Sequence, residues 1–97
     1  MKRDDVIDTL RAHQRELNEL GVQRVAVFGS VARGEDGEGS DLDLVVAFTD
    51  PPRHSLLDVV RVQRTLSDWL GTDVDLAVEP LHPRFRSRVE QDLVRAF

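Results

Sequence analysis

The sequence of 97 residues contains no cysteine, no tyrosine and no long apolar run. Without cysteine there is no disulfide framework, no cysteine zinc site and no thiol nucleophile, which agrees with a reducing cytoplasm. No apolar stretch approaches the roughly 20 residues of a membrane span. The charged residues among positions 1–5 replace the apolar core that a signal peptide needs. These absences lead us to expect a cytoplasmic protein without a membrane partner.

The composition is that of one small globular domain, which we expect to span residues 1–97. Apolar residues make up 40% and charged residues 32% of the chain, a balance that argues against disorder. The formal net charge is −5, and such an acidic domain disfavours general nucleic-acid binding. Four arginines gather towards the C-terminal end: Arg84, Arg86, Arg88 and Arg95. We interpret them as a solvated helix face; contact with an acidic partner or the nucleotide is the alternative.

Apolar spacing and chain breakers predict an alternating order of helices and strands. Helices are expected over residues 4–20, 31–34, 55–70 and 83–97, and strands over residues 24–28, 42–48 and 74–78. Gly21 and Gly71 mark helix ends, and Ser55 with Asp58 forms a start similar to a capping box. The order αβαβαβα indicates a mixed α/β domain, with helices packed on a small sheet of about three strands.

Two carboxylates stand at the start of the second expected strand. Because side chains of a strand alternate between faces, Asp41 and Asp43 share one face and the residues between and after them can enter the core. Two like charges about 4 Å apart repel by roughly 4 kcal/mol at a surface-like dielectric. A hard divalent cation such as Mg²⁺ turns this repulsion into attraction. Asp75 in the third strand can join them if the two strands are neighbours, and three carboxylates could then hold two metal ions.

The turn after the first expected strand has the features of a phosphate cradle. Gly29 lets the backbone approach a ligand closely, and free N–H groups at a following helix start favour an anion. Ser30 adds a hydroxyl, and Arg33 adds a positive charge suited to phosphate oxygens. A phosphate cradle beside a carboxylate cluster indicates phosphoryl or nucleotidyl transfer assisted by Mg²⁺.

The run Gly-Ser-Val-Ala-Arg-Gly at positions 29–34, followed by Ser-Asp-Leu-Asp-Leu at positions 40–44, resembles a known signature. It is that of the DNA polymerase beta-like nucleotidyltransferase superfamily. In a chain this short it is similar to the minimal nucleotidyltransferases (MNT), many of which are antitoxins paired with HEPN toxins. The resemblance covers roughly residues 25–78 and implies the nucleotidyltransferase fold.

The resemblance also implies a role for each matching position. Gly29 and Ser30 would hold the triphosphate of the nucleotide. Asp41 and Asp43 would bind two Mg²⁺ ions. Asp75 would bind the catalytic metal and help to deprotonate the acceptor. Arg33, which also lies in the motif, would contact phosphate or brace the loop.

The implied reaction transfers AMP from ATP, or another nucleoside monophosphate from its triphosphate, to a hydroxyl. In the antitoxin branch the acceptor is a tyrosine of the toxin, and the two proteins form a type VII-like toxin–antitoxin pair. Since this chain has no tyrosine, such an acceptor must lie on another protein. A non-catalytic module that neutralises its partner by complex formation is the alternative, and a catalytic subunit acting on a small molecule or an RNA end is a third possibility.

Other residues have plainer interpretations. His13, His54 and His82 show no metal-ligand spacing and are expected at the surface. Trp69 falls on the apolar stripe of its helix and is expected in the core, with a base-stacking platform as the alternative. The pair Asp41 and Asp43 could also be the solvated end of an acidic loop, but Gly29, Ser30 and Asp75 would then be coincidental.

Overall fold

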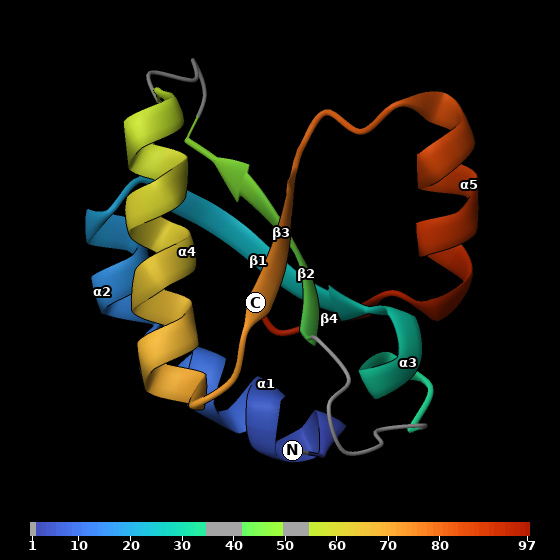
Figure 1. Cartoon of the computed structure of the whole chain (residues 1–97), viewed down its shortest axis with the longest axis horizontal. Helices are drawn as coiled ribbons and strands as arrows, with labels where there is room; N and C mark the ends of the chain where they lie inside the picture. The colour runs from blue at the N-terminus through green and yellow to red at the C-terminus, as the bar shows by residue number, and fades with distance from the viewer. Residues whose placement is uncertain (1, 35–41, 50–54) are drawn as a thin grey trace.

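The computed structural model describes residues 2–34, 42–49 and 55–97 (Figure 1). They form α1 (Arg3–Ala12), α2 (Gln14–Glu19), β1 (Val22–Phe28), α3 (Gly29–Ala32), β2 (Leu42–Phe48), α4 (Leu56–Leu70), β3 (Val74–Val78), α5 (Pro83–Asp92) and β4 (Val94–Arg95). The predicted mixed α/β class is confirmed, and β2 and β3 have the predicted bounds. None of the helices within these ranges combines the length and the hydropathy that a membrane crossing requires.

The strands form one mixed sheet in the order β3-β2-β1-β4. β1 runs antiparallel to β2 and to β4, whereas β2 and β3 are parallel neighbours. Parallel strands need a crossover connection, and α4 supplies it between β2 and β3. The sheet order therefore brings the two strands with the predicted carboxylates next to each other.

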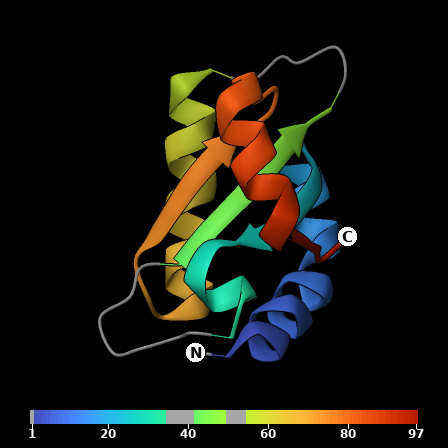
Figure 2. The ribbon, with the colours of Figure 1, turned by 90° about the vertical axis from the view of Figure 1, so that its right-hand side faces the viewer.

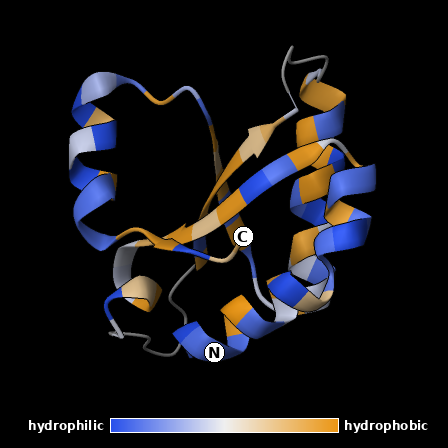
Figure 3. Cartoon of the chain, turned by 180° about the vertical axis from the view of Figure 1, so that it is seen from behind, coloured by the Kyte–Doolittle hydropathy of each residue, from blue (hydrophilic) through white to orange (hydrophobic). Residues whose placement is uncertain are grey.

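Helices cover both faces of the sheet, with α4 on one side and α5 on the other (Figure 2). The main core lies on the face towards α1, α2 and α4, where Val27, Leu44 and Leu66 are fully buried. In Figure 3 apolar and hydrophilic residues alternate along the helices that carry this core. On the opposite face Val45 is buried, and Val45 and Val89 line the same space between the sheet and α5.

Helix α4 has the predicted capping signals at both ends. The Ser55 N–H donates to Asp58 Oδ2 at 2.8 Å, and the Asp58 N–H donates to Ser55 Oγ at 3.4 Å, which completes a capping box. At the other end Gly71 adopts the left-handed conformation (φ 67°, ψ 23°). These caps fix where the crossover begins and ends, and so they help to set the register of β3 against β2.

The expected single helix over residues 4–20 is wrong, because the chain breaks at His13. His13 has φ −105° and ψ 15°, and it separates α1 from α2. Leu10 of α1 and Leu17 of α2 are both fully buried in the core. The polar residue Gln14, which interrupts the apolar spacing, starts the second helix.

The expected helix over residues 83–97 is wrong beyond Asp92. Leu93 is extended (φ −67°, ψ 124°), and β4 then pairs with β1. The N–H of Ala96 donates to the Val25 carbonyl at 2.9 Å, so hydrogen bonds to the β1 edge replace helical ones. Within the described part of the chain the sheet consequently has four strands rather than about three. Smaller shifts affect β1, which starts at Val22, and the short α3, which starts at Gly29.

Candidate active site

Asp43 and Asp75 lie side by side at partner positions of the parallel strands β2 and β3. On the other side of β2, Phe28 of β1 is the partner of Asp43. Residues at partner positions point to the same face, on strands about 4.8 Å apart. Phe28, Asp43 and Asp75 therefore form one row across the sheet, on the face opposite the main core. The strand order thus satisfies the condition under which Asp75 can join Asp43.

The two carboxylates have the chemistry of a magnesium site. Asp43 is half-buried and Asp75 is exposed. Two negative charges about 5 Å apart repel by about 3 kcal/mol at an effective dielectric constant of 20, so a cation between them is favoured. Their oxygens are the hard ligands that Mg²⁺ prefers. Asp41, the third predicted ligand, lies outside the described residues, and no cluster of three or more potential metal ligands occurs among those that the structure describes.

Gly29 brings the predicted phosphate cradle into contact with the Asp43 carboxylate. It has φ +76°, a conformation that favours glycine. A Cβ atom built on Gly29 would overlap Asp43 Oδ2 and lie 3.2 Å from Asp43 Cγ. The backbone at this turn and the carboxylate are therefore packed together without room for a methyl group. Ser30, the other cradle residue, is half-buried at the start of α3.

Arg33 forms an ion pair with α5. Its Nη1 donates to Asp92 Oδ2 at 2.8 Å, and the two side chains are 43% and 29% exposed. The same segment is held from α1, since Arg3 Nη1 donates to the Ala32 carbonyl at 3.3 Å. Of the two roles implied for Arg33, bracing the loop thus has a direct contact in the structure, while contact with phosphate stays a prediction.

A cleft of about 370 Å³ opens beside the carboxylates. Asp43 and Asp75 line it together with Phe28 and Phe85, whose rings meet edge-to-face at 5.7 Å and 85°. The sequence alone did not indicate that Phe85, in the expected last helix, lies at this cleft. Only the strand order, which that pattern does not reveal, brings this end of α5 to the row of Phe28, Asp43 and Asp75.

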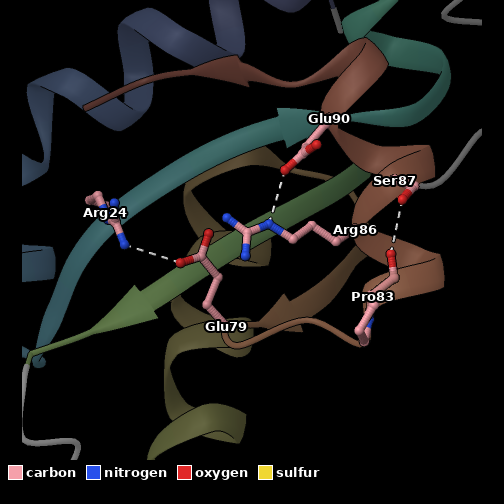
Figure 4. Close-up of polar contacts among 6 residues, drawn as sticks. All are labelled: Arg24, Glu79, Pro83, Arg86, Ser87 and Glu90. Carbon is pink, nitrogen blue, oxygen red and sulfur yellow. Dashed lines mark hydrogen bonds and ion pairs between the residues drawn. The ribbon is translucent and has the colours of Figure 1, made fainter.

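The arginines of the C-terminal region are exposed, as the interpretation of a solvated face requires: Arg84, Arg86, Arg88 and Arg95. Arg86 Nε lies 2.9 Å from Glu90 Oε1, one turn further along α5, and Arg24 of β1 pairs with Glu79 at 3.1 Å (Figure 4). The Ser87 hydroxyl donates to the Pro83 carbonyl. Arg86 is thus paired with a carboxylate of its own helix.

The remaining candidates have structural roles. Trp69 is half-buried against the core, and its ring stacks on that of His13 with centroids 4.0 Å apart. His82 accepts a hydrogen bond from the Arg84 N–H at the start of α5. His54 lies outside the described residues.

The sequence matches the nucleotidyltransferase domain over residues 9–96. This chain belongs to the nucleotidyltransferase family. It is similar to the protein adenylyltransferase MntA of Thermococcus cleftensis, with 40% identity over 77 residues that cover 78% of this chain and 76% of that protein. The family resemblance of the motifs is therefore confirmed, and so is the assignment of the protein as a nucleotidyltransferase enzyme.

Solved structures show the same fold. A protein assigned to the minimal nucleotidyltransferases is 41% identical, with a TM-score of 0.73 over 97% of this chain and 95% of that one. A chain from the complex of a tri-AMPylated Shewanella oneidensis HEPN toxin with its MNT antitoxin is 17% identical, with a TM-score of 0.60 over 90% of this chain and 71% of that one. At this low identity the second likeness shows the fold alone.

Proposed function

We propose that this nucleotidyltransferase is a Mg²⁺-dependent protein adenylyltransferase that acts as an antitoxin. It transfers AMP from ATP to the hydroxyl of a tyrosine of a cognate HEPN-type toxin. The observation that carries the proposal is the row in which Asp43 and Asp75 lie on adjacent strands, with the Gly29 backbone packed against Asp43. The similarity to MntA supports protein as the acceptor class.

The described residues fit a magnesium ion, because Asp43 and Asp75 offer carboxylate oxygens on one face of the sheet. Asp41 is the third proposed ligand. When bound, Mg²⁺ stabilises the negative charge of the phosphates. Gly29 and Ser30 hold the triphosphate; since Gly29 touches the Asp43 carboxylate, phosphates at this turn lie next to the proposed metal ligands.

The proposed reaction is a displacement at the α-phosphorus of ATP. The acceptor oxygen forms a bond to this phosphorus, and the bond from the phosphorus to the oxygen that bridges to the β-phosphate breaks. Pyrophosphate leaves, and the proton of the acceptor hydroxyl passes to the Asp75 carboxylate. Because the chain contains no tyrosine, a tyrosine acceptor belongs to the partner.

The direct test is transfer of label from ATP, labelled at the α-phosphate, to the co-purified partner in the presence of Mg²⁺. We expect label on the partner, no label in the presence of a chelator, and at least about a hundredfold slower transfer with Asp43→Asn, because this substitution removes the negative charge and one oxygen of a proposed metal ligand. Asp8→Asn, which removes an exposed carboxylate from α1, is the matched control. Equal labelling by wild type and Asp43→Asn would refute the proposal.

Protection of cells distinguishes catalysis from complex formation. When the toxin is co-expressed, Asp43→Asn should fail to protect while Asp8→Asn protects as well as wild type. Full protection by Asp43→Asn, with intact binding of the partner, would show that the protein neutralises by masking and not by adenylylation.

A further inference from the structure

Phe28 and Phe85 line the cleft beside Asp75. The proposed binding of metal and phosphate assigns no role to either ring. Phe85 projects from α5 with 37% of its surface exposed, although its ring is in contact with that of Phe28. The ring centroids of Phe85 and Phe28 lie 5.7 Å apart and the two rings are nearly perpendicular. This contact holds both rings beside the carboxylate row. The exposed part of Phe85 is therefore a fixed aromatic surface.

The rest of the cleft is poor in hydrogen-bond donors. Leu76 and Ala77 of β3 contribute apolar surface, and Asp43 and Asp75 contribute acceptors. The amide of Gln63 also lines the cleft, and one of its two N–H groups donates to the Val74 carbonyl at 2.8 Å. Among the described lining residues there is thus no positively charged side chain, and the side-chain polar groups are mainly acceptors.

This chemistry selects a flat apolar ring that carries a hydroxyl donor. A phenol matches it, since its ring can pack on Phe85 while its O–H points to a carboxylate. Adenine matches it less well: its amino group can donate to a carboxylate, but its ring nitrogens are acceptors, and the described side chains of the lining offer them only the second N–H of Gln63. The alcohol of serine or threonine has no ring to fill the aromatic side of the cleft.

We propose that Phe85, held by Phe28, is the seat for the aromatic ring of the acceptor and makes the enzyme selective for tyrosine over aliphatic hydroxyls. This inference rests on the proposed function, and it adds the residues that recognise the acceptor. A ring on Phe85 lies in the same cleft as Asp75, so its hydroxyl is placed beside the carboxylate that takes its proton. Phe85 positions the acceptor ring and takes no part in the bond changes at phosphorus.

The test is a kinetic comparison of Phe85 variants, with partner and nucleotide varied separately in the labelling assay. Phe85→Ala should raise the KM for the partner about tenfold and leave the binding of Mg²⁺ with a non-hydrolysable ATP analogue within about twofold of wild type. Phe85→Leu keeps an apolar side chain of similar bulk but no ring, and it should behave as Phe85→Ala. Phe85→Tyr and Phe85→Trp should remain close to wild type, since an aromatic face is preserved.

The outcomes separate the two proposals. If the wild-type protein labels its partner and Phe85→Leu has the wild-type KM, the aromatic seat is refuted while the adenylyltransferase stands. If Phe85→Leu weakens only the binding of the nucleotide, the aromatic seat is also refuted, and Phe85 is assigned to contact with the nucleotide base instead. If wild type transfers no label at all, the proposed function itself fails. Circular dichroism of each variant checks that α5 is intact.

Discussion

Gly29→Ala is the substitution for which the structure gives the sharpest prediction. The added methyl group would overlap the Asp43 carboxylate, and the backbone would hold alanine at φ +76°. Asp43 must then swing away from the turn. Because Asp43 is a proposed metal ligand, the variant should lose both stability and activity, and for separable reasons.

The two costs can be estimated and separated. A non-glycine residue in the left-handed region costs about 1–2 kcal/mol. Moving the Asp43 side chain off its rotamer adds about 1 kcal/mol, which brings the loss for Gly29→Ala to about 2–3 kcal/mol. Gly71→Ala is the matched control, because Gly71 has φ +67° and no described atom within 4 Å of an added Cβ. It should show the backbone cost alone.

Thermal unfolding, followed by the fluorescence of the single tryptophan, Trp69, measures the stability of both variants. Gly29→Ala should melt about 5 °C below Gly71→Ala, since about 1 kcal/mol corresponds to 4–8 °C in a domain of this size. Transfer of AMP should fall at least about a hundredfold in Gly29→Ala, as expected for a ligand displaced by about 1 Å, and remain normal in Gly71→Ala. Equal activity of the two variants would refute the reasoning.

Three further predictions concern the metal, the Arg33 ion pair and the cap of α4. Mg²⁺ with an ATP analogue should raise the melting temperature of wild type and leave that of Asp43→Asn unchanged, because the variant lacks a proposed metal ligand. An equal rise in both would contradict the site. If Arg33 leaves Asp92 to contact phosphate, Arg33→Ala should raise the KM for ATP while Asp92→Asn does not; equal effects in steady-state kinetics would assign it to bracing alone. Ser55→Ala should lower the free energy of unfolding by about 1 kcal/mol in urea titration, with AMP transfer unchanged, since its hydroxyl accepts from the Asp58 N–H.

Local signals were sufficient for much of the fold. The bounds of β2 and β3 followed from short apolar runs ended by breakers, and both caps of α4 followed from Ser55 and Gly71. The prediction for the C-terminal region failed for a physical reason. The periodic apolar residues of the expected last helix continue past Asp92, but the open edge of β1 offers backbone hydrogen-bond partners there. Tertiary pairing of β4 overrides a helical pattern that no local breaker interrupts.

The candidate site was only partly predictable for a related reason. Alternation along a strand can assign Asp43 and Asp75 to a face, but their adjacency depends on the order of β2 and β3 in the sheet. The pairing of Arg33 with Asp92 and the approach of Phe85 to Phe28 depend on where α5 crosses the sheet. Such contacts between distant segments leave no periodic trace in the sequence.

The row of Phe28, Asp43 and Asp75 has a consequence for the lifetime of the protein. Its members come from three strands, and a chain that has assembled only β1 and β2 holds only the first two of them. We therefore expect magnesium and nucleotide to bind the completed sheet and not its precursors, which favours the native state by mass action. Protease resistance should then rise with the supply of ATP, so that the substrate also protects the enzyme from degradation.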